Sequence, residues 1–76
     1  MRSRTGTWVH EVHGAPVEIA WTRTERGLIR LNCLAYVHRY GKEEGHQEEL
    51  EDLIPCWHTR MDIKDRIGMS LEGDNE

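Results

Sequence analysis

The chain of 76 residues contains no phenylalanine, only two cysteines and two prolines, and no long apolar run. No stretch approaches the roughly 20 apolar residues that a membrane-spanning helix requires, and the first residues lack the apolar core of a secretory signal. A membrane association is therefore not expected. Two cysteines in a chain without such a signal are expected to remain thiols, and the cytoplasm is the expected compartment.

The small size of the chain sets a second limit. A domain of this length buries only roughly 60% of the surface that its unfolded chain exposes, so a core and the walls of an active site would compete for the same few apolar residues. We expect a single domain over residues 1–76, with disordered tails at 1–6 and 70–76. No catalytic or cofactor motif stands out. The chain is therefore predicted not to be an enzyme and to need no cofactor.

Charge is distributed unevenly along the chain, whose formal net charge is −4. Residues 1–42 carry seven Lys or Arg against three acids, whereas residues 43–76 carry three Lys or Arg against eleven acids. The first part is therefore basic and the second strongly acidic. Such a division indicates that the two parts present different surfaces to a partner.

The strongest structural pattern covers residues 28–40. Its odd positions are apolar, whereas its even positions mix polar and aromatic residues; the odd set is Ile29, Leu31, Cys33, Ala35 and Val37. Because strand side chains alternate between two faces, this pattern predicts a long, half-buried strand. A second apolar row of the same period is formed by Val17, Ile19 and Trp21, and residues 7–12 give a weaker strand signal.

Two turns are expected to join these strands into an antiparallel meander. His13-Gly14 favours a two-residue turn, because glycine adopts positive φ freely. The resulting pairs are Val12–Ala15, His10–Val17 and Trp8–Ile19. Residues 25–27 favour a three-residue hairpin loop with Gly27 in the left-handed conformation. The resulting pairs are Trp21–Leu31, Ile19–Cys33 and Val17–Ala35.

The pattern becomes helical after residue 45. Leu50, Leu53 and Ile54 stand at helical spacing, which predicts a short amphipathic helix from His46 with an acidic outer face, ended by Pro55. A second helix is predicted to begin near Thr59 and to use Ile63, Ile67 and Leu71 as its buried face. The predicted fold is thus α+β, a three-stranded antiparallel meander (β-β-β) followed by two short helices packed on one sheet face. Trp57 is expected to fill the join between the helices.

Four residues are of types that ligate zinc: Cys33, His38, Cys56 and His58. Structural zinc sites show close ligand pairs, whereas Cys33 and His38 lie on opposite faces of a regular strand. A reactive thiolate needs exposure and a positive neighbourhood, which the apolar row does not offer. We therefore expect no metal site, and we expect both cysteines to be small buried apolar groups.

Large side chains on the even positions of the central strand remain to be explained. They mix aromatic, apolar and basic types, and the set is Arg30, Leu34, Tyr36, His38 and Tyr40. Tyrosine and arginine among apolar neighbours are typical of protein interfaces. They are also typical of single-stranded nucleic-acid platforms, where bases stack on aromatic rings. A third alternative is that a tail or helix covers this face, or that it is an ordinary amphipathic solvent face.

The sequence therefore predicts a small non-enzymatic protein-binding module of dimer-forming, adaptor or inhibitor type. Its partner would be another protein or a second copy of the chain. The binding surface would be the even face of the central strand, with a secondary acidic surface at Glu48, Glu49, Glu51 and Asp52. The alternative is an RNA- or single-stranded-DNA-binding module that uses the same sheet face; the acidic net charge weighs against it, because phosphate binding relies on clustered positive charge.

Overall fold

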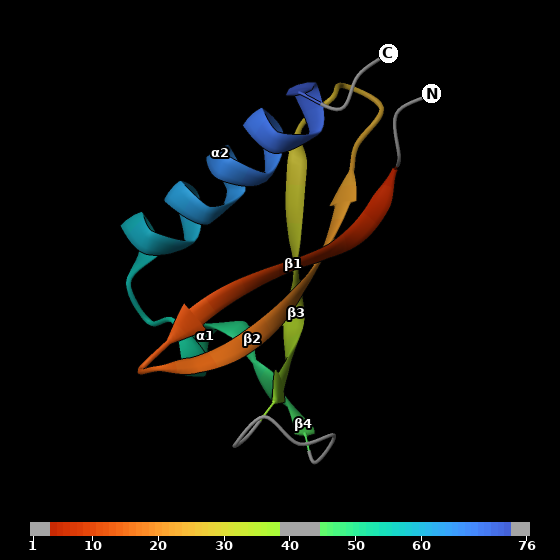
Figure 1. Cartoon of the computed structure of the whole chain (residues 1–76). Helices are drawn as coiled ribbons and strands as arrows, with labels where there is room; N and C mark the ends of the chain where they lie inside the picture. Colours follow the sequence, from red (N-terminus) through yellow and green to blue (C-terminus); the bar gives the residue numbers. More distant parts are fainter. Residues whose placement is uncertain (1–3, 39–44, 74–76) are drawn as a thin grey trace.

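The computed structural model describes residues 4–38 and 45–73 of the chain. Four strands form one antiparallel sheet in the order β1-β2-β3-β4, and two helices follow (Figure 1). The elements are β1 (Thr5–Val12), β2 (Ala15–Arg23), β3 (Ile29–His38), β4 (Gly45–Glu49), α1 (Leu50–Leu53) and α2 (Trp57–Gly73). The predicted α+β meander with helices on one face is confirmed, but the predicted number of three strands is wrong.

The first hairpin has the predicted register. Val12 pairs with Ala15, His10 with Val17 and Trp8 with Ile19. Both turn residues have positive φ, 51° at His13 and 80° at Gly14, which matches the twist that two-residue hairpins require.

The second hairpin closes through a loop of three residues, as predicted. The Thr24 N–H donates to the Leu28 carbonyl at 2.8 Å, and the Thr24 hydroxyl accepts from the Leu28 N–H at 3.1 Å. Gly27 has a φ of 82°. The first predicted pair, Trp21 with Leu31, is therefore present.

Beyond that pair the predicted register is wrong. Ile19 pairs with Ala35 and not with Cys33, and Val17 pairs with Val37 and not with Ala35. From the Trp21–Leu31 pair to the next, β2 advances two residues while β3 advances four, so β3 carries two extra residues there. A shift of two residues restores the side-chain alternation, and Ala35 therefore still faces the core.

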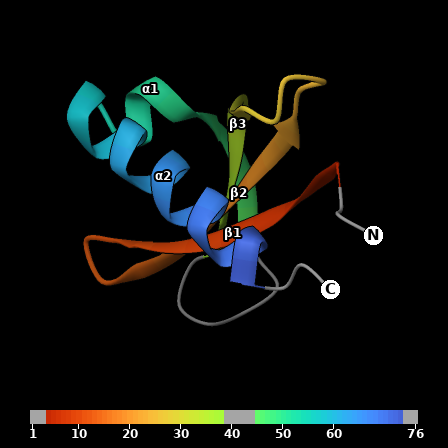
Figure 2. The same cartoon turned by 90° about the horizontal axis from the view of Figure 1, so that it is seen from above.

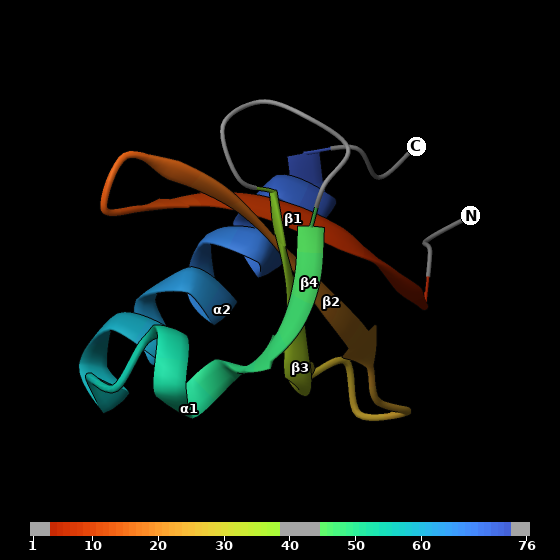
Figure 3. The same ribbon diagram turned by 90° about the horizontal axis from the view of Figure 1, so that it is seen from below.

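β4 was not predicted, since residues 46–49 were assigned to a helix. The strand pairs antiparallel with residues 34–38 of β3, and the chain passes directly from β4 into α1 (Figure 3). A Cβ atom on Gly45 would lie only 2.6 Å from Cε1 of Tyr36, so the tyrosine ring rests on this glycine. The predicted acidic helix is thus reduced to the single turn of α1.

α2 begins two residues before the predicted start, and Cys56 precedes it. The Arg60 N–H donates to the Cys56 carbonyl at 3.1 Å, which is the first hydrogen bond of the helix. The helix extends to Gly73 and β1 begins at Thr5, so residues 5–6 and 70–73 of the predicted tails belong to regular elements. The rest of both tails, apart from Arg4, lies outside the described residues.

The core lies between one face of the sheet and the two helices, which are on the same side of the sheet (Figures 1 and 2). β2 and β3 contribute Val17, Ile19, Trp21, Ile29, Ala35 and Val37, while the helices and their link contribute Leu50, Ile54, Ile63 and Ile67. Trp57 does not fill the join between the helices, because 59% of its surface is exposed. Within the described residues, no helix is long and apolar enough to cross a membrane.

Candidate functional site: a groove beside the free edge of β3

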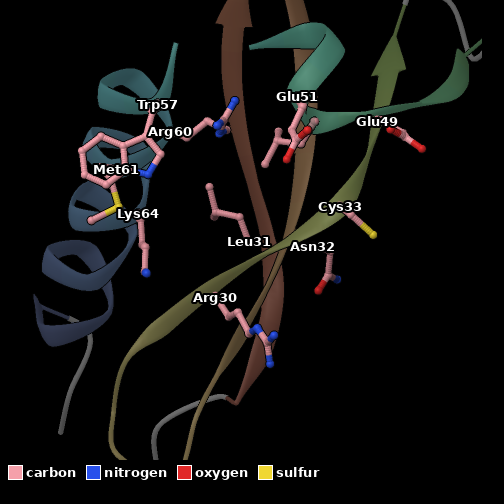
Figure 4. A pocket seen from close by; sticks show the side chains of 11 residues that line it. Arg30, Leu31, Asn32, Cys33, Glu49, Glu51, Trp57, Arg60, Met61 and Lys64 are labelled. Atoms are coloured by element: carbon pink, nitrogen blue, oxygen red, sulfur yellow. The ribbon is translucent and has the colours of Figure 1, made fainter. Parts of the chain in front are cut away.

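A groove of about 390 Å³ opens between β3 and the first half of α2 (Figure 4). We call it the β3–α2 groove. It is lined by Arg30, Leu31, Asn32 and Cys33 from β3, by Glu49, Leu50 and Glu51 from the junction of β4 and α1, and by Trp57, Arg60, Met61 and Lys64 from α2.

Four successive residues of β3, 30–33, line this groove. Residues 32 and 33 lie where the extra residues of β3 interrupt the regular alternation of side chains. The junction of β4 and α1 also lines the β3–α2 groove, so the groove lies beside the edge of β3 that faces away from β2. That edge is free because β4 pairs only with residues 34–38, and no strand among the described residues pairs with 29–33 on the side away from β2.

The backbone of Leu31 points toward this free edge. Thr24 and Leu28 form a hydrogen-bonded pair, and antiparallel pairs alternate between bonded and non-bonded types. By this alternation Arg30 bonds to Thr22 of β2, whereas Leu31 directs its N–H and C=O away from β2. The groove thus offers, together with side chains, a backbone donor and acceptor with which no strand of residues 4–38 and 45–73 pairs.

α2 forms the opposite wall. Trp57, Met61 and Lys64 lie at helical spacing of four and three residues, and Figure 4 shows them along the side of the helix that flanks Leu31. Trp57 is exposed, whereas Leu31 and Met61 are half-buried and Leu50 is buried. The groove therefore has an apolar middle of four residues with one large ring available for contact.

Arg60 is fixed rather than free. Its guanidinium donates to the carbonyl of Ile54 at 2.7 Å and to the carbonyl of Pro55 at 3.3 Å. These bonds tie α2 to the link that follows α1. Arg60 therefore holds the wall of the groove in place, and its charge is partly engaged.

The other charges of the groove are separated by sign. Glu49 and Glu51 lie at the end near the junction of β4 and α1, while Arg30 and Lys64 lie toward the other end (Figure 4). Within the described residues none of these four side chains takes part in an ion pair. The β3–α2 groove therefore combines an acidic end, an apolar middle and a basic end.

Of the described residues predicted to form a binding surface on the sheet face, the structure places only one in the groove. Arg30 lines the groove, whereas Leu34, Tyr36 and His38 lie elsewhere on β3, and Leu34 is 44% exposed. The rings of Tyr36 and His38 meet edge to face with centroids 4.6 Å apart. His38 Nε2 lies 3.4 Å from Glu18 Oε1 of β2. Tyr40 lies outside the described residues.

The predicted acidic surface is also divided. Glu48 and Glu49 belong to β4 rather than to a helix, and Glu51 and Asp52 lie in α1. Glu49 and Glu51 reach the groove, whereas the Glu48 side chain contacts His46. Asp52 is exposed away from the groove. The four acids therefore do not form the continuous helical face that was predicted.

Both cysteines are exposed, contrary to the expectation that they are buried. The two extra residues of β3 carry Cys33 out of the apolar row. The pKa of Cys56 lies below its ordinary value because the Thr59 hydroxyl and the N–H groups of Thr59 and His58 donate to the sulfur at the start of α2. The described residues contain no cluster of three His, Cys, Asp or Glu that could hold a metal ion.

Sequence reasoning missed the α2 wall of the groove. The spacing of Trp57, Met61 and Lys64 on a helix could have revealed it, had the helix been started at Trp57. Comparison of the chain with family models, with curated proteins and with solved structures finds no match in any of the three.

Proposed function

We propose that the protein is a non-enzymatic protein-binding module that takes up an extended segment of a partner protein in the β3–α2 groove. The observation that supports this most directly is the free edge at residues 29–33, which lies inside a groove with apolar side chains. Extended peptides commonly bind such edges as an added strand, with main-chain bonds giving affinity and side-chain pockets giving specificity.

The partner segment would lie along residues 29–33 of β3, beyond the point at which β4 ends. Its backbone would bond to Leu31, and one apolar side chain would lie among Trp57, Met61 and Leu50. Tryptophan is among the residue types that carry most binding energy in protein interfaces. The two charged ends would select a segment with a basic residue toward Glu49 and an acidic residue toward Arg30.

A competing function, binding of single-stranded nucleic acid, has one observation in its favour. Trp57 is exposed in a groove that also contains the cations Arg30 and Lys64, and a base could stack on its ring while phosphates meet the cations. Glu49 and Glu51 in the same groove oppose a polyanion, so a protein segment fits the charges better. We further propose that the module acts in the cytoplasm, where the free thiols of Cys33 and Cys56 would stay reduced.

The test is selection of short peptides from a displayed random library on the immobilised protein. We expect enriched peptides with an apolar residue between a basic and an acidic one. Trp57→Ala should weaken their binding by at least about tenfold, since truncation of a central interface residue costs about 2 kcal/mol or more. The matched control is Val9→Ala, a 60% exposed apolar residue on β1 that is remote from the groove, and it should leave binding unchanged.

Backbone pairing gives a sharper readout. N-methylation of the selected peptide at successive positions should block binding at alternate positions only, because a strand directs every second N–H toward its neighbour. Uniform sensitivity, or equal binding by the Trp57→Ala and wild-type proteins, would contradict strand addition in this groove. Labelled single-stranded RNA and DNA oligonucleotides are tested in parallel, and tight binding of either with steep salt dependence would favour the alternative function.

A further inference from the structure

The two outer edges of the sheet differ in how well they are protected. β4 is five residues long, and its sequence GHQEE places two carboxylates on that edge. β1 is eight residues long, contains neither lysine nor proline, and has Glu11 as its only acid. It pairs with β2 from end to end without a bulge. Charge, proline, bulges and short length are the usual devices that keep strand edges from pairing with other chains, and β1 lacks nearly all of them.

The backbone groups on the outer side of β1 can be assigned from its pairing with β2. The Arg23 N–H donates to the Arg4 carbonyl at 2.6 Å, and Val12 and Ala15 close the two-residue turn. The even residues of β1 therefore bond to β2, and the odd residues direct their N–H and C=O outward. Thr5, Thr7, Val9 and Glu11 thus present four donors and four acceptors, with which no strand among the described residues pairs.

We infer that this edge is a dimerisation surface, on which β1 pairs antiparallel with β1 of a second copy about a two-fold axis at Trp8. In this register Thr5 faces Glu11 of the second copy and Thr7 faces Val9. Every outward backbone group of the strand finds a partner, and the two four-stranded sheets become one continuous sheet.

The composition of β1 favours a second copy as the occupant. In the antiparallel two-fold register the acid of each strand, Glu11, stands opposite the uncharged Thr5 of the other copy. No like charges stand opposite each other, and the β-branched residues Thr7 and Val9 form cross-strand pairs of a favourable kind. Because the axis stands perpendicular to the sheet, the helices of both copies lie on the same side of the continuous sheet, and its other face stays open.

The proposed register can be tested by changing the charges of residues 5 and 11, which face each other across the two-fold axis. Sedimentation velocity over a range of concentrations should show a monomer–dimer equilibrium for the wild-type protein. Thr5→Glu puts a carboxylate opposite Glu11 in both halves of the dimer and should weaken dimerisation by about fivefold to tenfold, whereas Thr5→Lys should strengthen it by a similar factor. The double variant Thr5→Glu with Glu11→Lys sets opposite charges facing each other in both halves and should dimerise at least as tightly as the wild type.

Strengthening by Thr5→Lys and rescue by the double variant cannot arise from a loss of folding. Trp57→Ala, in the β3–α2 groove, is the control and should leave dimerisation unchanged. The two proposals, dimerisation through β1 and peptide binding in the groove, are therefore tested independently. A protein that stays monomeric at the highest concentrations, or a dimer that is indifferent to residue 5, would overturn the inference.

Amide hydrogen exchange supplies an independent readout. As concentration rises, the N–H groups of Thr5, Thr7, Val9 and Glu11 should become protected, while those of Gly6, Trp8 and His10 should be protected at all concentrations because they bond to β2. Concentration-dependent protection of the β4 edge instead of β1 would assign self-association to the other side of the sheet and would also overturn the inference.

Discussion

Two glycine-to-alanine substitutions should change stability in opposite directions. Gly6 of β1 lies directly opposite Trp21 of β2, and the indole ring lies across it. A Cβ atom on Gly6 would be 2.6 Å from Cζ2, 2.9 Å from Cε2 and 3.1 Å from Nε1 of Trp21. Since carbon atoms in contact are about 3.5–4.0 Å apart, the ring would have to move by about 1 Å.

Trp21 has little room to move, because only 4% of its surface is exposed and it belongs to the central core. Overpacking of this kind costs about 1–3 kcal/mol. In a domain of this size each kcal/mol shifts the melting temperature by about 4–8 °C, so Gly6→Ala should lower it by about 5–20 °C.

Gly68→Ala is the matched control. Gly68 lies within α2, where alanine is favoured over glycine by about 1 kcal/mol, and a Cβ atom there would meet only Ile29 Cγ1 at an ordinary 3.8 Å. This variant should raise the melting temperature by about 4–8 °C. Circular dichroism melts and urea titrations of both variants measure the difference.

A double-mutant cycle isolates the clash. Trp21→Leu removes the ring atoms that meet the new methyl group, so Gly6→Ala should destabilise the Trp21→Leu protein by less than it destabilises the wild type. An unchanged melting temperature in Gly6→Ala, or equal effects in both backgrounds, would refute the reasoning from the close approach of the indole ring.

Three further predictions follow from single positions. Gly27→Val should destabilise the fold by about 1–3 kcal/mol in urea titrations, since its φ of 82° disfavours β-branched residues while leaving room for the side chain. Gly45→Ala should remove amide protection from residues 46–49 but not from β2, because the new Cβ would collide with the Tyr36 ring and the Val37 carbonyl. Alkylation of Cys56 should follow a thiolate whose pKa is lowered by its hydrogen bonds from Thr59, so the reactive fraction appears at lower pH than for an ordinary thiol; Thr59→Val should raise the midpoint of the rate–pH profile.

The meander, its two turns and the core face could be predicted from residue patterns. Alternation fixed Val17, Ile19, Trp21 and Ala35 as core residues, and Gly14 and Gly27 marked the turns through their tolerance of positive φ. These signals are local, and each depends on the chemistry of a few adjacent residues. For that reason the structure confirms these local predictions.

The register of β3 could not be predicted in the same way. Its two extra residues lie between Leu31 and Ala35, and an insertion of two residues leaves the alternation of side chains intact. The periodicity of apolar residues therefore cannot reveal the two extra residues. Its consequences are the shifted pairs Ile19–Ala35 and Val17–Val37 and the exposure of Cys33, which the pattern places in the core.

The strand β4 could not be predicted from the sequence for a different reason. Its sequence has no apolar alternation, and what holds it is its pairing with the preceding strand β3 and the packing of the Tyr36 ring on Gly45. Strand preference is strongly dependent on such neighbours.

The groove itself follows from the point at which β4 stops. Of the predicted helical triplet, Leu50 and Leu53 lie in α1 and Ile54 follows it as the C-cap residue; Leu50 and Ile54 are buried in the core with Leu53 packed against it. Burial of these three side chains requires the chain to turn away from the edge of β3 after Glu49. The helical turn that follows cannot form strand hydrogen bonds with β3. The requirement of α1 for burial thus leaves residues 29–33 without a partner strand, and it places Glu49 and Glu51 at the point where the free edge begins. The edge and its acidic end therefore have a single physical origin, which is why the sequence could supply the charged residues of the site but not the surface that they border.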